Sequence, residues 1–209
     1  MFKSFLPAFA ALVIALVVSA CGKSTADVAA AQANPGIPAE LNESSYKPAV
    51  EKTLAEAHAA IADRALTEDR LDANAAAIKA LMAQADKLNV DKAKRSDAEL
   101  MSALGALYTR KAAFHIDSPQ QAGTYSAQGF HYLDRAVSQY PDNITARLDR
   151  GMTAARVPDF MNKREVARDD LRFATNSPRF AELSPELQAR VRETLAEVER
   201  QLAQPDGQP

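Results

Sequence analysis

Residues 129–141, GFHYLDRAVSQYP, decide the fold of this chain. Gly129, Leu133 and Ala136 recur at the spacing that places side chains on one face of a helix. The two small residues leave room for a second helix to approach, and Leu133 fills the space between them. Pro141 cannot continue a helix, so we expect this helix to end just before it.

The sequence from Pro48 onward is expected to be helical, because no segment alternates apolar and polar residues with a period of two. Only 7 of the 209 residues are glycine, which also favours helix. Five helix starts carry residues that can cap backbone N–H groups. They are Thr67, Ser96 with Glu99, Ser118, Asn162 with Glu165, and Ser184. We therefore expect an all-α fold of about seven helices, at residues 48–65, 67–88, 97–114, 118–140, 142–157, 162–177 and 184–204.

The pattern of residues 129–141 occurs a second time. Ala167, Leu171 and Ala174 have the same mutual spacing as the small and large residues of the first helix. Together with the further positions given in the next sentence, these residues resemble the signature of the tetratricopeptide repeat (TPR) family. The eleven positions expected to pack repeats together are Leu104, Gly105, Tyr108, Gly129, Leu133, Ala136, Pro141, Gly151, Ala167, Leu171 and Ala174.

The TPR resemblance implies antiparallel helical hairpins stacked within residues 48–204. Its clearest repeats are residues 97–141 and 142–178, and residues 184–204 form a C-terminal capping helix. Gly105 and Gly129 are further apart in the sequence than the corresponding positions of a TPR. We therefore expect extended helices or an inserted loop around residues 116–124. Residues 48–88 fit a helical hairpin without a TPR signature.

The N-terminus resembles the signal peptide of bacterial lipoproteins. An apolar run from Phe5 to Ala20 follows Lys3 and ends in Val-Ser-Ala immediately before Cys21, the only cysteine of the chain. The resemblance implies cleavage after residue 20 and acylation of Cys21. Several acyl chains give stable membrane anchoring where one does not. An ordinary secretory signal with a chance cysteine is the alternative.

Residues 21–47 are rich in polar residues and contain two prolines, so we expect a flexible tether between the lipid and the helices. No Asp follows Cys21. By analogy with bacterial lipoproteins, this favours the outer membrane, with the folded part facing the periplasm.

Composition and spacing disfavour several other classes of function. A net charge of −2 gives no electrostatic basis for binding nucleic acid. The histidines, His58, His115 and His131, lack the spacing of a metal site, and the sequence has no phosphate loop or nucleophile elbow. We therefore expect no metal, no cofactor and no enzymatic activity. Residues 164–172 are expected to form a solvated charged helix face.

The TPR resemblance places the first helix of each pair on a concave surface. In this chain that surface would contain Ser102, Ala106, Thr109, Leu148, Met152 and Ala155. These residues are small or apolar, so we expect an apolar peptide rather than an acidic tail as ligand. The tyrosines Tyr108, Tyr125, Tyr132 and Tyr140 can pack between repeats or contribute to a peptide-binding surface.

Two kinds of binding protein fit these observations. The first is a lipid-anchored periplasmic scaffold that binds another envelope protein or peptide and contacts the membrane through its anchor. The second is an accessory protein that holds a small hydrophobic ligand between its helices. A cluster of Ser, His and acidic side chains in one pocket would instead indicate an enzyme.

Overall fold

Seven α-helices and three short 3₁₀ helices make up residues 41–63, 65–91 and 95–204, which the computed structural model describes. The expected all-α fold class is confirmed, and these residues contain no strand. The α-helices are α2 (Glu43–Ala62), α3 (Glu68–Lys87), α4 (Asp97–Ala112), α5 (Pro119–Gln139), α6 (Ile144–Ala154), α7 (Arg164–Asn176) and α8 (Pro185–Ala203). The 3₁₀ helices are η2 (Ala113–His115), η3 (Asp159–Met161) and η4 (Pro178–Glu182).

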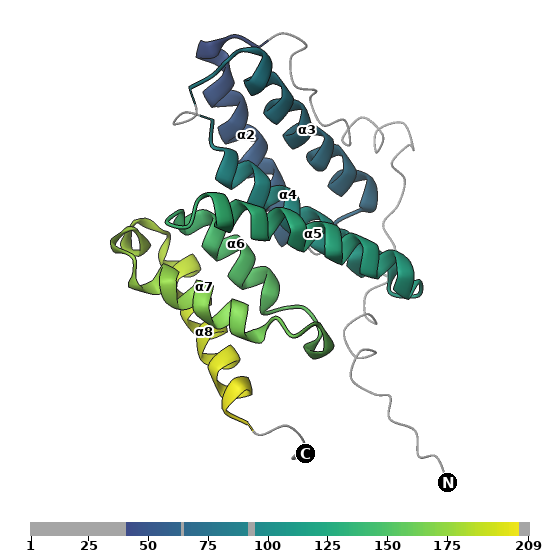
Figure 1. Ribbon diagram of the computed structural model, residues 1–209, viewed down its shortest axis with the longest axis vertical. Coiled ribbons are helices and arrows are strands. Elements are labelled where there is room, and N and C mark those ends of the chain that lie inside the picture. Colours follow the sequence, from purple (N-terminus) through teal and green to yellow (C-terminus); the bar gives the residue numbers. More distant parts are fainter. Residues whose placement is uncertain (1–40, 64, 92–94, 205–209) are drawn as a thin grey trace, which may run out of the picture. The chain divides into compact units, whose positions relative to one another are not determined.

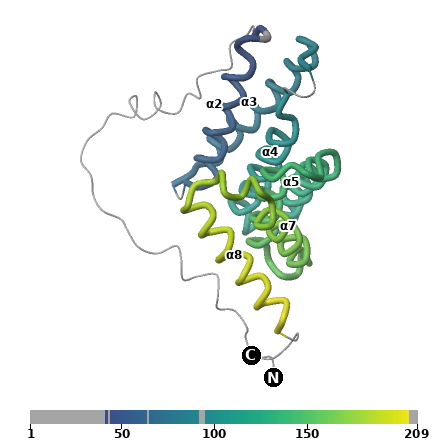
Figure 2. The backbone as a smooth tube through the Cα atoms, turned by 90° about the vertical axis from the view of Figure 1, so that its left-hand side faces the viewer, coloured from purple at the N-terminus to yellow at the C-terminus, as the bar shows by residue number. Residues whose placement is uncertain are grey.

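Consecutive α-helices pair as antiparallel hairpins. Within the pair formed by α4 and α5, Ala98 and Met101 belong to the same cluster as Ala136 and Val137, whereas Gly105 faces Gly129. Between α6 and α7 the order is also opposite, because Ala154 clusters with Ala167 and Ile144 clusters with Ala174. Figures 1 and 2 both show α8 at the far end of the stack from α2 and α3.

Helix α4 lies at the centre of this arrangement and packs against α2, α3, α5 and α6 (Figure 1). All residues from Leu100 to Tyr108 are buried. Within this run only Ser102 and Tyr108 carry a side-chain hydroxyl, so the helix is apolar on nearly every side. A helix of that kind is buried all round rather than on one stripe.

The closest contact between helices occurs where α4 crosses α5 at two glycines. A Cβ atom added to Gly105 would lie 2.7 Å from the carbonyl oxygen of Gly129. One added to Gly129 would lie 2.7 Å from the carbonyl oxygen of Gly105 and 2.8 Å from the amide nitrogen of Thr109. These neighbours are backbone atoms, so neither glycine can be replaced without separating the helices.

The second hairpin, α6 with α7, packs through the other glycine expected to lie between helices. A Cβ atom on Gly151 would lie 3.0 Å from the side chain of Leu171 and 3.1 Å from that of Asp170. Of the eleven positions proposed for repeat packing, only Pro141 is exposed, in the turn after α5. The other ten are buried: Leu104, Gly105, Tyr108, Gly129, Leu133, Ala136, Gly151, Ala167, Leu171 and Ala174.

The first helix begins earlier than expected, at Glu43 instead of Pro48, so the end of the expected tether is helical. Asn42 caps α2 by accepting a hydrogen bond from the amide of Ser45. Tyr46 is 1% exposed, and its hydroxyl donates to the carbonyl of Arg95 at 3.1 Å. Burial of this large side chain offsets the backbone hydrogen bond lost at the exposed Pro48.

Several expected caps are absent, although the helices themselves form. Ser96 has a left-handed backbone (φ 51°) and Ser118 lies outside the usual N-cap region, and neither side chain caps its helix. Asn162 is also left-handed, and α7 begins one residue later than the expected box. Thr67 and Ser184 do cap their helices. No long loop is inserted around residues 116–124, because the extra residues extend α5.

Candidate functional site

The turns that follow α2, α4 and α6 lie at one end of the helices, and we call them the turn edge. Helices α4 and α6 run in the same direction, because Glu99 contacts Asn143 and Ser102 contacts Asp149. Helix α3 runs opposite to α4, so α2 is also parallel to α4. Within the part of the chain that the structure describes, the turn edge therefore comprises residues 63, 65–67, 113–118 and 155–163.

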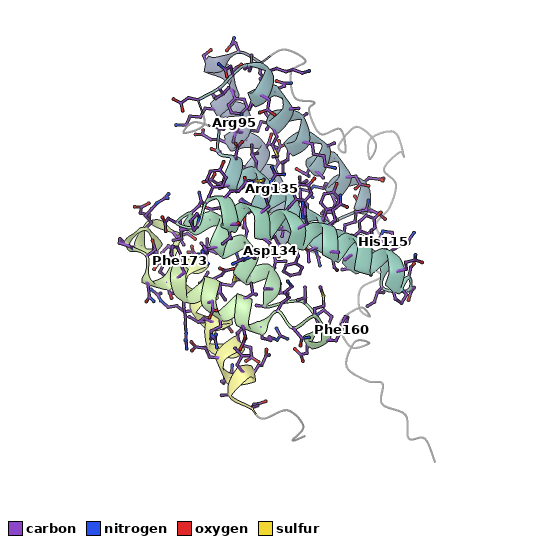
Figure 3. The ribbon with its side chains drawn as sticks, in the orientation of Figure 1. Arg95, His115, Asp134, Arg135, Phe160 and Phe173 are labelled. Carbon is purple, nitrogen blue, oxygen red and sulfur yellow. The ribbon has the colours of Figure 1, made fainter. Side chains whose placement is uncertain are left out.

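The three most exposed large apolar side chains of the described residues all belong to the turn edge. Phe114 is 41% exposed, Ile116 62% and Phe160 82%. Figure 3 labels Phe160, which lies on η3, and His115, which lies on η2. Phe114 belongs to the same short helix η2. The third helix was expected to continue to residue 114, and that boundary is wrong because α4 ends at Ala112. Exposed apolar groups gathered in one region are typical of an interaction surface.

A network of charged and aromatic side chains holds η2 against α3 and α5. The His115 Nε2 atom lies 3.0 Å from Glu68 Oε1, and its ring centroid lies 4.9 Å from that of Tyr125. The Lys111 ammonium lies 2.7 Å from Asp72 and 4.7 Å from the centroid of Tyr125. These contacts fix the backbone that presents Phe114 and Ile116.

The charges in this network stabilise one another. Burial alone would lower the pKa of Lys111, but hydrogen bonds to Asp72 and Glu68 raise it above its ordinary value. Hydrogen bonds from Lys111 and then His115 lower the pKa of Glu68. Lys111 and Glu68 therefore stay ionised at neutral pH.

The tyrosines differ in how deeply their side chains are buried. Tyr108 is 9% exposed and stacks on Tyr132, with ring centroids 5.9 Å apart, while the Lys79 ammonium contacts its hydroxyl. Tyr125 and Tyr140 are half-buried, and the Tyr140 hydroxyl lies 3.5 Å from Asp97. Packing between helices therefore accounts for Tyr108, one of the two roles considered for these residues.

The first half of the expected peptide groove is not an open surface. Ser102 is fully buried and Ala106 is 6% exposed, so neither can line a groove. Thr109 is half-buried, and its hydroxyl donates to the carbonyl of Gly105 at 3.0 Å. The expectation was wrong for Ser102 and Ala106 because α4 is covered by neighbours on more than one side.

The α6 part of the expected groove is also drawn into the core. Leu148 is 7% exposed and packs with Leu171, Phe180 and Val191. Met152 is half-buried against the same cluster. Ala155 is half-buried and packs against a second cluster, which contains Phe130 and Leu133. These three residues therefore contribute to the packing of α6 and its C-terminal end against α5, α7 and α8.

Ser102, Asp149 and His58 meet where α2, α4 and α6 come together. The Ser102 hydroxyl donates to Asp149 Oδ2 at 2.5 Å, and His58 Nε2 lies 3.6 Å from the same oxygen. This interaction with Asp149 raises the pKa of His58, against the opposing effect of burial. In a serine nucleophile triad the histidine lies between hydroxyl and carboxylate. Here the carboxylate is in the middle, so the serine proton is already held by Asp149.

The other two histidines are far from this junction in the sequence and lie on other elements. Like His58, neither was expected to bind a metal. His115 belongs to the η2 network, and His131 is exposed on α5, with its ring edge against Tyr132. Across residues 41–63, 65–91 and 95–204, no group of three or more His, Cys, Asp or Glu side chains is arranged to hold a metal ion.

A buried ion cluster connects α5, α6 and α7. Asp170 has no exposed side-chain surface and accepts from Arg147 at 2.8 Å and from Arg150 at 2.6 Å. Arg150 also contacts the partly exposed Asp134 at 3.0 Å. Desolvation would lower the pKa of Arg150, but hydrogen bonds to Asp170 and Asp134 raise it. The expectation of a solvated charged face on residues 164–172 is therefore wrong at Asp170.

Comparisons with family models, curated proteins and solved structures gave no match. None of the helices in the described part of the chain is long and apolar enough to cross a membrane. Cys21, the signal peptide and most of the expected tether lie outside the described residues.

The exposed residues of the turn edge were missed in the sequence, although a signal was present. Phe114 and Ile116 lie just before Asp117-Ser118-Pro119, and Phe160 lies two residues after Pro158. Such turn residues end helices and place their neighbours at the surface. Apolar residues inside a turn segment are therefore better candidates for binding than those on a helix stripe.

Proposed function

We propose that this chain is a lipid-anchored protein of the bacterial cell envelope that binds another protein through its turn edge. The observation that carries the binding proposal is the exposure of Phe114, Ile116 and Phe160 on turns at one end of the helices. Each is large enough to fill an apolar pocket of a partner. Folding leaves these side chains exposed to water. Binding to a partner would remove them from water and gain hydrophobic free energy.

The rigid support behind these side chains favours binding. The η2 turn is held by His115, Lys111 and Tyr125, so Phe114 and Ile116 are presented on a supported turn. A preorganised surface loses less conformational entropy when a partner binds. The partner in this proposal presents an apolar peptide or surface, as expected for the groove, but it docks on the turn edge instead.

The repeat family and the anchor remain part of the same proposal. The glycines Gly105, Gly129 and Gly151 support a TPR-like stack, because each lies where two helices meet closely. The position of Cys21 directly after the apolar N-terminal run supports acylation. We propose the outer membrane as the site of anchoring, with the helices in the periplasm.

Substitution Cys21→Ala tests the anchor. We expect the wild-type chain to sediment with membranes and to resist extraction by high salt, because acyl chains bind by the hydrophobic effect. The variant should appear in the soluble fraction or as an unprocessed precursor. Metabolic labelling with a palmitate analogue gives a second readout, and label on the Cys21→Ala chain would contradict acylation at that residue.

Photo-crosslinking in intact cells tests the binding surface. A photoreactive phenylalanine analogue is placed singly at Phe114, Ile116 or Phe160, and control probes replace Asp142 and Arg179. The controls are exposed and lie in the turns after α5 and α7, at the other end of the helices. We expect one adduct of the same mass from the three turn-edge probes and none from the controls. Adducts from the controls alone would contradict the assignment.

A further inference from the structure

Phe160 is held in an exposed position by the turn on which it lies. Its side chain is 82% exposed, whereas Val157 and Met161 on either side of it pack into the core cluster that contains Phe130. Figure 3 labels Phe160 in this turn, between α6 and α7. Because its neighbours are anchored in the core, the turn directs Phe160 away from the core.

A single arginine closes this turn. Arg164 Nε and Nη2 donate to Asp159 Oδ1 at 2.9 and 2.7 Å, and its Nη1 donates to the carbonyl oxygen of Ala155. One guanidinium group therefore joins the end of α6, η3 and the start of α7. Backbone hydrogen bonds within residues 158–162 add to this support. A side chain carried by such a turn is ordered before a partner arrives, so binding costs less conformational entropy.

The most exposed apolar side chains of the turn edge protrude from the surface. Ile116 is 62% exposed and Phe160 is 82% exposed, whereas the walls of a groove would cover side chains that line it. A protruding side chain is removed from water only when the partner surrounds it, as hot-spot residues are surrounded in well-packed pockets. A flat surface or an extended peptide would cover one side of the Phe160 ring and leave the other in water.

The charges beside these side chains favour a protein over a lipid surface. Asp117 directly follows Ile116 in the sequence. Asp159 directly precedes Phe160, and both acidic side chains are exposed. Arg156 is exposed on the same edge, so the charges around the apolar groups are of mixed sign. Segments that bind anionic bilayers carry Lys and Arg beside their apolar groups, whereas an apolar centre with a polar rim is usual in protein interfaces.

We propose that the partner of the turn edge is a folded protein with an apolar pocket, and that Phe160 fills this pocket. The inference rests on the proposed binding function of the turn edge and adds to it the shape of the partner. A pocket that encloses a phenyl ring has a limited volume, so it accommodates a larger ring only with strain.

The test measures the photo-crosslinked adduct formed in intact cells by a probe at Ile116 in the full-length chain, by yield and by mass. Phe160→Ala should lower the yield by about tenfold or more, because the pocket is left unfilled. Phe160→Trp should also lower the yield several-fold, because the indole ring overpacks the pocket. A bilayer or a flat apolar surface would accept Trp at least as well as Phe, since Trp is favoured at such interfaces.

Leu88→Trp is the control, and it should leave the yield unchanged. Leu88 is also an exposed large apolar residue, but it follows α3 at the opposite end of the helices. All three variants should melt within a few degrees of the parent chain, because the changed side chains are exposed.

Two kinds of result would overturn the pocket. A yield from Phe160→Ala equal to that of the parent chain, or a yield from Phe160→Trp at or above it, overturns the pocket and leaves the proposed function standing. If the parent chain forms no protein adduct, or an adduct with the mass of a single lipid, the pocket and the proposed function are both overturned.

Discussion

Gly129 determines how closely α4 and α5 pack. Its missing side chain lets the backbone of α4 approach to distances that a methyl group would not permit, and Gly105 does the same from the opposite helix. Leu133 and Ala136, on the same face, are fully buried against α4 and its neighbours. The sequence predicted this face correctly, because small residues at helical spacing have few other uses.

Gly129→Ala should lower the free energy of unfolding by about 3 kcal/mol, because the added methyl group meets backbone atoms that cannot rotate away. Gly123→Ala is the control in the same helix, since a Cβ atom there meets nothing within 4 Å. That change should stabilise by about 0.5–1 kcal/mol through a less flexible unfolded chain. Urea denaturation of both variants gives the comparison. Equal stabilities would contradict the close approach at Gly129.

His58 introduces a pH dependence at the junction of α2, α4 and α6. Its folded pKa lies above the ordinary value of 6.5 because of its interaction with Asp149. A group whose pKa rises on folding stabilises the folded state at pH values below its unfolded pKa. That contribution is lost as the pH rises through the folded pKa, so this contact stabilises the protein more in mildly acidic than in alkaline solution.

His58→Gln should therefore destabilise the protein more at about pH 5.5 than at about pH 8. The His58 side chain is 42% exposed, so the difference should be about 0.5 kcal/mol or less. His131→Gln is the control, because His131 is exposed and forms no ion pair within the described part of the chain. Denaturation at both pH values measures the effect. A larger loss at the higher pH would have the wrong sign for this contact.

At the scale of the elements, α4 shows what sequence periodicity can and cannot predict. Its existence was predicted from the sequence pattern that includes Leu104 and Tyr108. Its antiparallel pairing with the next helix was expected from the TPR resemblance. The burial of α4 on nearly every side was not predicted, because a stripe pattern assumes that one face of the helix remains in solvent. The nearly unbroken apolar run from Leu100 to Tyr108 was the available signal that no face is exposed.

Helix boundaries were less predictable than the helices. Ser96 and Asn162 have the side chains of capping residues, but their left-handed backbones direct those side chains elsewhere. At α2 the structure depends on a tertiary contact, since Tyr46 is anchored by Arg95, 49 residues further along the chain. Local propensity cannot reveal a contact of that kind.

The ion cluster around Asp170 gives a prediction about how α6 and α7 hold together. Asp170→Ala would leave Arg147 and Arg150 without their buried partner, so we expect a loss of about 3 kcal/mol in the free energy of unfolding. Asp169→Ala is the control one residue away, where the side chain is 62% exposed beside Arg168. It should change stability by less than about 0.5 kcal/mol. Thermal or urea unfolding that finds equal losses would contradict a structural role for the cluster.

At the scale of the whole molecule, the hairpin arrangement explains why the candidate binding residues are distant in sequence but share one edge. Phe114 and Phe160 follow helices that run in the same direction, so their turns emerge at the same end. The sequence indicated hairpins but not which turn residues would face solvent. That choice depends on where α4 and α6 end, at Ala112 and Ala154.

The central claim is that the turn edge binds a protein. Its most direct test is the yield of the photo-crosslinked adduct from a probe at Ile116 in cells, measured with and without Phe114→Ser and Phe160→Ser. Both side chains are exposed, so the double variant should melt within a few degrees of wild type. We predict a discrete adduct in the parent chain that is largely lost in the double variant. An adduct of equal yield in both, at equal melting temperature, would contradict the claim.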